Sequence, residues 1–138
     1  AIKNQKIKHP TIKDIAKIVG KIRKNRLPNP ALIGNSGSFF KNPIVSNVAL
    51  DRLKQKFSKL VSFRESDSNY KLSAAWLIEQ CGFKNIKEKN VGVYKNQALV
   101  ITNLGNATGE EIRLFSEKIK STVLEKFDIL LEEEVNII

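Results

Sequence analysis

The order in which strand-like and helix-like segments follow one another constrains the fold most strongly. Short strand candidates, such as residues 38–45 and Ala98–Leu104, lie between longer segments whose apolar residues recur at helical spacing. Nothing resembles a dinucleotide-binding fold, because no GxGxxG motif follows a strand. The mixed order and the short strands therefore predict an α+β fold, with a small, largely antiparallel sheet and helices packed on one side.

Four segments are predicted to be helices, and each begins at a Ser or Thr that can cap it. These capping residues are Thr11, Ser46, Ser73 and Thr108. Gly82 is the expected left-handed residue after the third helix, and Glu111 completes a capping box at the start of the fourth. In the first helix, one face carries Ile12, Ile15, Ala16, Val19 and Ile22 at helical spacing. The expected buried faces are Leu50, Leu53, Phe57 and Leu60 in the second helix, and Ile112, Phe115, Ile119, Val123 and Phe127 in the fourth.

The segments between the helices are predicted to be strands and connections. They are an extended linker at Pro28 and Pro30, strands at 38–45, Ala98–Leu104 and Ile129–Ile138, a polar loop at Arg64–Tyr70, and a turn at Gly105 and Asn106. We expect Trp76 to fill the core and Cys81 to pack on the inner face of the third helix.

The cysteine and histidine content limits the chemistry. Cys81 is the only cysteine, so no internal disulfide can form, which fits a reducing cytoplasm. His9 is the only histidine, and we assign it no role. With these two residues a zinc site has no ligand set and a Ser-His or Cys-His catalytic pair is nearly excluded. No apolar run is long enough to cross a membrane, so no membrane partner is expected.

Positive charge is concentrated at the start of the chain. Of the net charge of +10, residues 1–30 carry nine basic and one acidic side chains, and residues 31–138 carry fifteen and thirteen. This basic first helix allows a non-catalytic nucleic-acid-binding module as an alternative function. However, no known DNA or RNA motif is present, and no aromatic side chain lies among its lysines to stack on a base. A solvated helix face explains the charge equally well.

The 138 residues suffice for one ordinary domain with a core. Methionine is absent, so Ala1 is not a natural start, and we expect the chain to be a piece of a longer protein.

The segment "GNSGSFFKNP" at residues 34–43 has the glycines of a phosphate-binding loop. It is not a Walker A motif, because Gly37 is followed by Ser38 and Phe39 rather than by Lys and Ser or Thr. The simpler interpretation is a glycine-rich turn that leads into a strand.

The alternative is a ligand-binding loop. Phe39 and Phe40 could anchor the segment by burial and leave Ser38 free to act. In an extended segment Ser38, Phe40 and Asn42 would share one side, where a hydroxyl and an amide can bind a polar ligand.

Two further groups of side chains have a functional and a simpler interpretation. Glu132 and Glu134 would lie on one face of a strand, where repulsion between carboxylates can raise a pKa for acid–base work. A solvated edge strand explains them better. Lys84, Lys95 and Gln97 could serve a phosphate-bearing ligand, although most surface lysines have no such role.

Several longer segments occur together in one order, from about Arg23 to Val135. They are "LPNP…GNSGSFFKNPIVS", "KLSAAWLIEQCGFK", "VGVYKNQALVITNLGNAT" and "EKFDILLEEEV". Their combination resembles the C-terminal part of the UDP-N-acetylenolpyruvoylglucosamine reductase (MurB) family of bacterial cell-wall synthesis. The departures are Ser36 for the commoner alanine, Ala75 for glycine, Tyr94 for a frequent histidine, Glu133 for the proline of "LEPEV", and Arg26 for the commoner lysine.

The resemblance implies a flavoenzyme. Members bind FAD in an N-terminal region, take electrons from NADPH, and reduce the enolpyruvyl group of UDP-N-acetylglucosamine enolpyruvate to give UDP-N-acetylmuramate. Residues 1–26 would then be the basic helix and linker at the end of the FAD-binding region, and 27–138 the substrate-binding domain. We expect this piece alone to bind no FAD and to be inactive, and the intact protein to be a cytoplasmic monomer without nucleic-acid or membrane partners.

The resemblance also implies the site residues. Ser38 corresponds to the catalytic serine, the general acid that protonates the carbon beside the carboxylate. Glu134 corresponds to the catalytic glutamate, which helps to polarise the substrate carboxylate or to stabilise the enol. The implied substrate contacts are Arg26 at the pyrophosphate, Leu27 at the uracil, and Asn42, Lys84 and Gln97 at the nucleotide.

Overall fold

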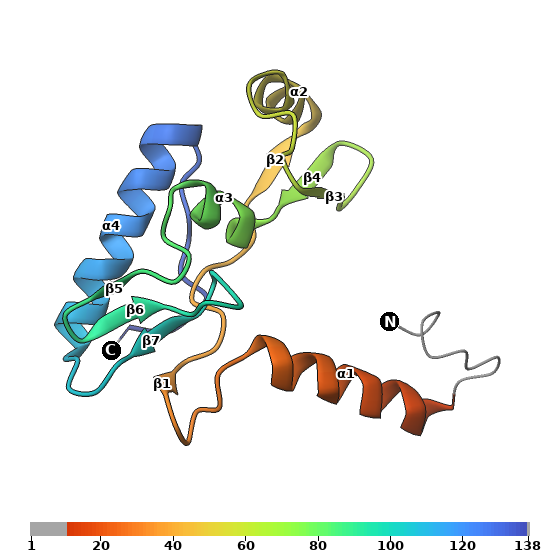
Figure 1. Ribbon diagram of the computed structural model, residues 1–138. Coiled ribbons are helices and arrows are strands. Elements are labelled where there is room, and N and C mark those ends of the chain that lie inside the picture. Colours follow the sequence, from red (N-terminus) through yellow and green to blue (C-terminus); the bar gives the residue numbers. More distant parts are fainter. Residues whose placement is uncertain (1–10, 138) are drawn as a thin grey trace.

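The computed structural model describes residues 11–137 (Figure 1). The described part contains α1 (Ile12–Arg26), β1 (Gly34–Asn35), β2 (Ile44–Ser46), α2 (Asn47–Lys56), β3 (Ser62–Arg64), β4 (Asn69–Leu72), α3 (Ala74–Gln80), β5 (Lys87–Glu88), β6 (Val91–Val93), β7 (Ile101–Asn103) and α4 (Gly109–Phe127). His9 lies outside the described residues, as do the first part of the basic segment and Ile138, the last residue of the predicted final strand.

The strands form two small antiparallel sheets rather than the single sheet that we predicted. The strand order is β1-β7-β6-β5 in the first sheet and β2-β4-β3 in the second. Each sheet packs against its own helix, since α4 contacts β6 and β7 and α2 contacts β2 and β4. The α+β fold class is confirmed.

One hydrophobic core joins both sheets. It includes Leu72 of β4, Leu77 and Ile78 of α3, Val93 of β6 and Ile119 of α4. The short helix α3 lies in the middle of the molecule and contacts α4 (Figure 1). Trp76 and Cys81 are partly buried against this core, as expected. Burial raises the pKa of the Cys81 thiol, which lowers the fraction present as the reactive thiolate.

The predicted caps are confirmed at all four helices. Thr11, Ser46, Ser73 and Thr108 each accept a hydrogen bond from a backbone N–H in the first helical turn. Gly82 follows α3 with a φ of 83°, a conformation that glycine adopts without strain. Local capping chemistry therefore fixed where each helix begins.

The predicted strands were less accurate. Arg64–Tyr70 is not a loop throughout, because β3 and β4 pair as a hairpin in which Arg64 lies opposite Tyr70. A strand on an exposed sheet shows little apolar alternation, which explains the polar sequence. The hairpin β5–β6 was not predicted. In the predicted strand Ala98–Leu104 only Ile101–Asn103 pairs, since Val100 N–H donates to the carbonyl of Gln97 in a turn.

The two other predicted strands are also shorter than expected. Within 38–45, strand pairing begins only at Ile44 of β2, and Phe40 forms an isolated bridge with Glu133. That bridge is the only β pairing of residues 129–137, and Leu131 beside it is buried in the core. The C-terminal segment is thus held by packing and by a single bridge rather than by a sheet.

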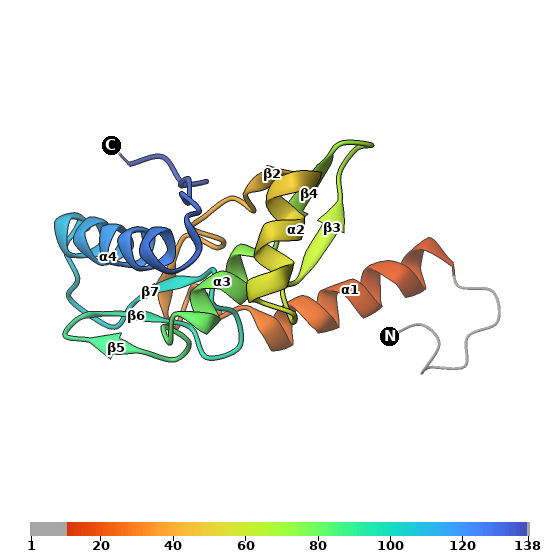
Figure 2. The same cartoon turned by 90° about the horizontal axis from the view of Figure 1, so that it is seen from above.

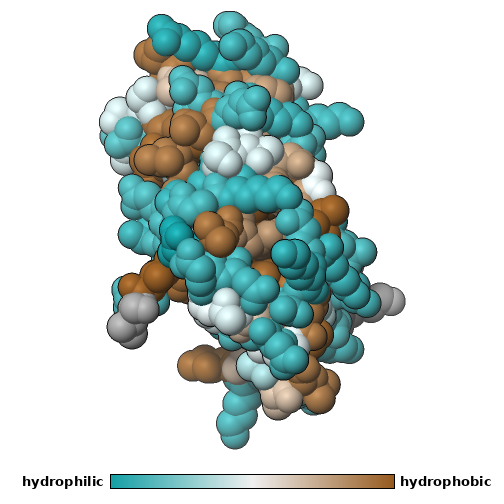
Figure 3. Space-filling model, turned by 90° about the vertical axis from the view of Figure 1, so that its left-hand side faces the viewer, coloured by the Kyte–Doolittle hydropathy of each residue, from teal (hydrophilic) through white to brown (hydrophobic). Residues whose placement is uncertain are grey.

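Helix α1 extends away from both sheets (Figure 1, Figure 2). Its apolar face is open: Ile12, Ile15, Val19 and Ile22 are exposed, and Ile18 is the buried residue of the helix. On the face seen from the side of α4, hydrophilic residues cover much of the surface and hydrophobic residues lie in separate patches (Figure 3). Among residues 11–137, no helix is both long and apolar enough to cross a membrane.

Candidate functional site

The glycine-rich loop turns sharply at Gly37. Asn35 fixes the turn, because its side-chain oxygen accepts a hydrogen bond from Gly37 N–H at 3.1 Å and its amide donates to the carbonyl of Ile33 at 2.8 Å. Gly37 has a φ of 79°, with no heavy atom close to where a Cβ would lie. Backbone conformation, rather than crowding, therefore requires glycine immediately before Ser38.

Phe39 and Phe40 anchor the loop. Both rings are buried and they pack edge to face, with centroids 5.1 Å apart. Ser38 is half-buried beside them. Phe40 is buried in the core whereas Asn42 is exposed, and within residues 38–42 only Phe40 takes part in a β bridge. That Ser38, Phe40 and Asn42 share one side in an extended segment stays a prediction.

Backbone hydrogen bonds bring distant segments to the loop. Phe39 N–H donates to the carbonyl of Leu99, and Glu134 N–H donates to the carbonyl of Phe39, each at 2.8 Å. The first bond holds the turn that contains Gln97, and the second places Glu134 beside the residue that follows Ser38. The two side chains that the resemblance implies as catalytic are therefore carried by paired segments.

The end of α1 joins the same assembly. The side-chain amide of Asn96 donates to the carbonyl of Asn25 at 3.0 Å, which ties the Gln97 turn to the residue before Arg26. Leu27 caps α1, and its N–H donates to the carbonyl of Arg23. Arg26 is exposed and Leu27 is half-buried.

A cavity of about 920 Å³ opens between the end of α1 and the glycine-rich loop. Arg23, Lys24 and Leu27 line it on one side, and residues 35–37 line it on the other. Its volume suits a nucleotide-sized ligand, and two cationic side chains with backbone and amide donors suit an anionic one. The cavity is thus lined by Leu27, which follows Arg26, and by Gly37, which precedes Ser38.

Asn42 and Lys84 are engaged elsewhere. The side-chain oxygen of Asn42 accepts a hydrogen bond from Ala74 N–H at 2.9 Å, so it caps the start of α3. Lys84 lies beyond the other end of α3 and forms an ion pair with Glu79 at 2.9 Å. The amide nitrogen of Asn42 remains a possible ligand donor, whereas Lys84 would have to exchange Glu79 for a ligand.

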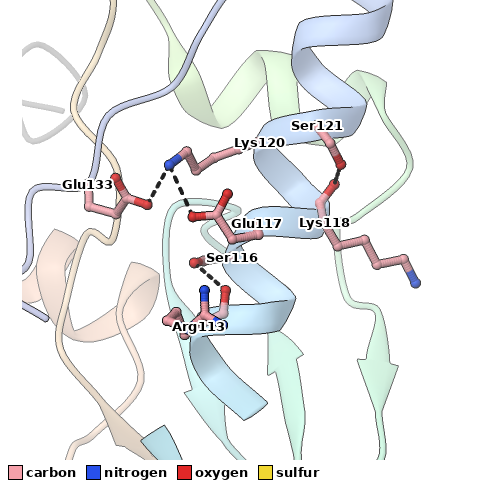
Figure 4. Close-up of polar contacts among 7 residues, drawn as sticks. All are labelled: Arg113, Ser116, Glu117, Lys118, Lys120, Ser121 and Glu133. Carbon is pink, nitrogen blue, oxygen red and sulfur yellow. Dashed lines mark hydrogen bonds and ion pairs between the residues drawn. The ribbon is translucent and has the colours of Figure 1, made fainter. Parts of the chain in front are cut away.

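The C-terminal acidic segment contains an ion pair that sequence reasoning missed. Lys120 of α4 donates to Glu133 at 2.8 Å and to Glu117 at 3.2 Å (Figure 4). Burial, the largest single influence, raises the pKa of Glu133, but the hydrogen bond from Lys120, a backbone hydrogen bond and the charge of Lys120 together outweigh it, so the pKa lies below its ordinary value. The pKa of Lys120 is raised, chiefly by the hydrogen bond to Glu133. Both groups are therefore charged at neutral pH.

The signals for the missed residues differ. Glu117 lies one turn before Lys120, so that pair follows from helical spacing. The pairing of Lys120 with Glu133, and that of Asn96 with Asn25, depends on tertiary structure and leaves no local pattern. Among the described residues, no group of three His, Cys, Asp or Glu side chains could hold a metal ion.

The structure is therefore that of an α+β domain with a cavity beside the end of α1. Residues 29–138 match the model of the family described as UDP-N-acetylenolpyruvoylglucosamine reductase, C-terminal domain. The chain therefore belongs to the UDP-N-acetylenolpyruvoylglucosamine reductase family, as a C-terminal domain.

Curated relatives with that name match almost the whole chain. The protein of Flavobacterium johnsoniae is 47% identical over 96% of this chain and 39% of its own length. The protein of Pseudomonas aeruginosa is 41% identical over 99% of this chain and 40% of its own length. That of Porphyromonas gingivalis is 44% identical over 94% of this chain and 38% of its own length. The chain thus spans about two fifths of the length of these relatives, and the comparisons do not support a nucleic-acid-binding module.

Proposed function

We propose that this chain is the substrate-binding part of a UDP-N-acetylenolpyruvoylglucosamine reductase that converts UDP-N-acetylglucosamine enolpyruvate to UDP-N-acetylmuramate for peptidoglycan synthesis. The observation that carries the proposal is the bond from Glu134 N–H to the carbonyl of Phe39, which joins the two segments that bear Ser38 and Glu134. The names of the relatives, which are reductases of this substance, support it.

The reaction needs a hydride and a proton on the two carbons of one double bond. FAD, reduced by NADPH and bound by a preceding region of the intact protein, would supply the hydride to the far carbon. We assign neither cofactor to residues of this chain, because the cavity at the glycine-rich loop is lined by neighbours of the proposed substrate residues. The residues of this chain would then stabilise the negative charge that hydride addition leaves on the substrate and donate the proton to the other carbon of the double bond.

Ser38 would donate the proton to the carbon beside the substrate carboxylate. A serine hydroxyl is a weak acid, so it can serve only when it is held close to a strongly basic carbon centre. The left-handed turn at Gly37 and the burial of Phe39 hold the serine backbone in this way. Glu134 would orient the substrate carboxylate or stabilise the enol form from the paired segment.

The nucleotide would occupy the cavity beside α1. Arg26 would bind the pyrophosphate, because a guanidinium donates in pairs to phosphate oxygens, and Leu27 would lie against the uracil. Gln97 would approach from the turn that Asn96 ties to α1. Asn42 and Lys84 would complete the nucleotide contacts, with Lys84 released from Glu79.

The exposed face of α1 would meet the FAD-binding region of the intact protein. Residues 1–26 would belong with that region and 27–138 would form the substrate-binding domain. We further propose that the intact protein is a cytoplasmic monomer that needs no nucleic acid or membrane. The isolated 138-residue chain should purify colourless and inactive, and stoichiometric flavin in it would contradict this division.

The direct test measures NADPH oxidation by the intact protein with and without UDP-N-acetylglucosamine enolpyruvate. Wild type should oxidise NADPH in a substrate-dependent manner, and Ser38→Ala should lose about 10²–10⁴-fold in kcat with flavin still bound. Ser58→Ala removes an exposed hydroxyl outside the loop and the cavity and is the control, with activity near that of wild type. A colourless wild type, or Ser38→Ala as fast as wild type, would refute the proposal.

A further inference from the structure

The segment that carries Glu134 is attached to the glycine-rich loop by one bridge. Lys41 N–H donates to the carbonyl of Glu132, and Glu134 N–H donates to the carbonyl of Phe39, both at 2.8 Å. Phe40 and Glu133 are the directly opposed pair between these bonds. Two hydrogen bonds without a continuing sheet leave such a bridge free to open unless side chains hold it.

Opposed side chains of an antiparallel pair project to the same face. Phe40 is buried, so the side chain of Glu133 also projects into the protein, where its exposed fraction is 21%. Glu132 and Glu134, the neighbours of Glu133, are exposed on the other side. Of the three glutamates in this segment, Glu133 is therefore the one whose carboxylate can pair with a side chain inside the protein.

Lys120 meets Glu133 at that point. The Lys120 side chain is only 18% exposed and lies between Glu117 of its own helix and Glu133 of the bridge (Figure 4). The other ion pair across this bridge, Lys41 with Glu132, is longer at 3.5 Å and well exposed. An exposed pair of this kind contributes little, so Lys120 provides the main charged link between α4 and the bridge.

We propose that Lys120 is a positioning residue, which through Glu133 holds the bridge closed and so fixes Glu134 relative to Ser38. The functional part of this inference rests on the proposed function. The ammonium group of Lys120 pairs with Glu117 and Glu133, which are neither Ser38 nor proposed substrate contacts. Its effect is on the geometry of the segment that bears Glu134, and small misplacements of a reacting group are costly for rate.

The test uses the intact protein and the variant Lys120→Met, which keeps the aliphatic stem and removes the charge. Lys118→Met is the matched control, because Lys118 lies on the same helix and pairs with the exposed Glu88. Hydrogen–deuterium exchange at the amides of Lys41 and Glu134 reports on the bridge without any activity. We expect these amides to exchange about tenfold faster in Lys120→Met, in line with local opening, and to be unchanged in Lys118→Met.

The kinetic arm measures kcat and KM for the enolpyruvyl substrate. Lys120→Met should lower kcat about tenfold, while KM changes less than about twofold, because positioning of the reacting groups is lost rather than nucleotide binding. Glu133→Pro in the Lys120→Met background should recover most of kcat. The double variant leaves only the Glu117 carboxylate without its partner, and that side chain is 49% exposed to solvent. Glu133 N–H donates to neither bond of the bridge, so proline can stiffen the segment without breaking it.

The outcomes are distinguishable. Unchanged exchange at Lys41 and Glu134 in Lys120→Met overturns the inference whatever the activity is. Faster exchange with wild-type kcat shows that the bridge does not set the rate and also overturns it. Wild-type protein without substrate-dependent NADPH oxidation refutes the proposed function, and with it the kinetic role of Lys120, while the exchange arm still decides whether Lys120 closes the bridge.

Discussion

Helices α1 and α4 begin in the same way and end up in opposite environments. Each has a capping box, formed by Thr11 with Asp14 and by Thr108 with Glu111. In α4 the apolar face is buried, and Ile119 is fully inaccessible to solvent. In α1 the corresponding face is open, with Ile12 86% exposed.

This difference separates what a helix needs in order to form from what it needs in order to be buried. A cap and helical spacing are local properties, and both helices have them. Burial requires a partner surface, which β6 and β7 supply to α4. An exposed apolar face of this kind marks an interaction site, and in the proposed function its partner is the preceding FAD-binding region.

The largest effect that the comparison predicts is in the core. Ile119→Ala should lower the free energy of unfolding of the 138-residue chain by about 2–5 kcal/mol, because it leaves a cavity between α4 and the sheet. Ile22→Ala on α1, which is 39% exposed, should change it by less than about 0.5 kcal/mol. Urea titration of both variants measures this, and equal losses would show that α1 is packed in this chain.

An intermediate effect is expected when the intact protein is compared with this chain. Ile15→Gln should destabilise the intact protein by about 1–2 kcal/mol, because a buried isoleucine loses its apolar contacts. In the 138-residue chain the same change should be nearly neutral. Lys17→Gln on the same helix is the control and should be neutral in both. Thermal unfolding decides, and a neutral Ile15→Gln in the intact protein would mean that this face has no internal partner.

Loss of the Thr108 cap of α4 and loss of the Thr11 cap of α1 should affect different properties of the chain. Thr108→Ala should cost about 1 kcal/mol of global stability, because α4 is part of the core. Thr11→Ala should fray α1 and reduce helical circular dichroism without moving the unfolding midpoint. A midpoint that shifts equally in both variants would contradict the separation of α1 from the core.

The smallest effect concerns pH. The side-chain hydrogen bond from Thr11 lowers the pKa of Asp14, and the backbone hydrogen bond from Thr108 lowers that of Glu111. A carboxyl whose pKa is depressed by folding stabilises the folded form above its unfolded pKa, and this contribution is lost as pH falls through the folded value. NMR titration should find both pKa values low. On acidification, protonation of Glu111 should lower the global stability of the chain, because Glu111 caps α4. Protonation of Asp14 should not, because α1 lies outside the core.

The sequence predicted the local parts of the fold well. Capping residues such as Ser46 and Ser73 mark helix starts without reference to the rest of the chain. The hairpin β3–β4 was not predicted because Arg64–Tyr70 is polar and was therefore interpreted as a loop. Polar residues also occur in exposed strands, so polarity alone does not separate the two. The apolar face of α1 was identified from its periodicity, but periodicity reports only that a helix is amphipathic and not whether its partner lies within the same chain.

The candidate site could be predicted only in part. Ser38 and Glu134 came from the resemblance, and the loop at Gly37 from its glycines. The hydrogen bonds that bring Leu99, Phe39 and Glu134 together are tertiary, and they leave no pattern in the sequence. The pairing of Lys120 with Glu133 could not be foreseen for the same reason.

The central claim is that Ser38 of this domain protonates the substrate, and separate half-reactions of the intact protein test it most directly. Rapid-mixing absorbance would follow flavin reduction by NADPH, and then flavin reoxidation by the enolpyruvyl substrate. The account predicts that Ser38→Ala reduces at the wild-type rate and reoxidises about 10²–10⁴-fold more slowly. Reoxidation at the wild-type rate would contradict it and leave Ser38 as a residue of the turn.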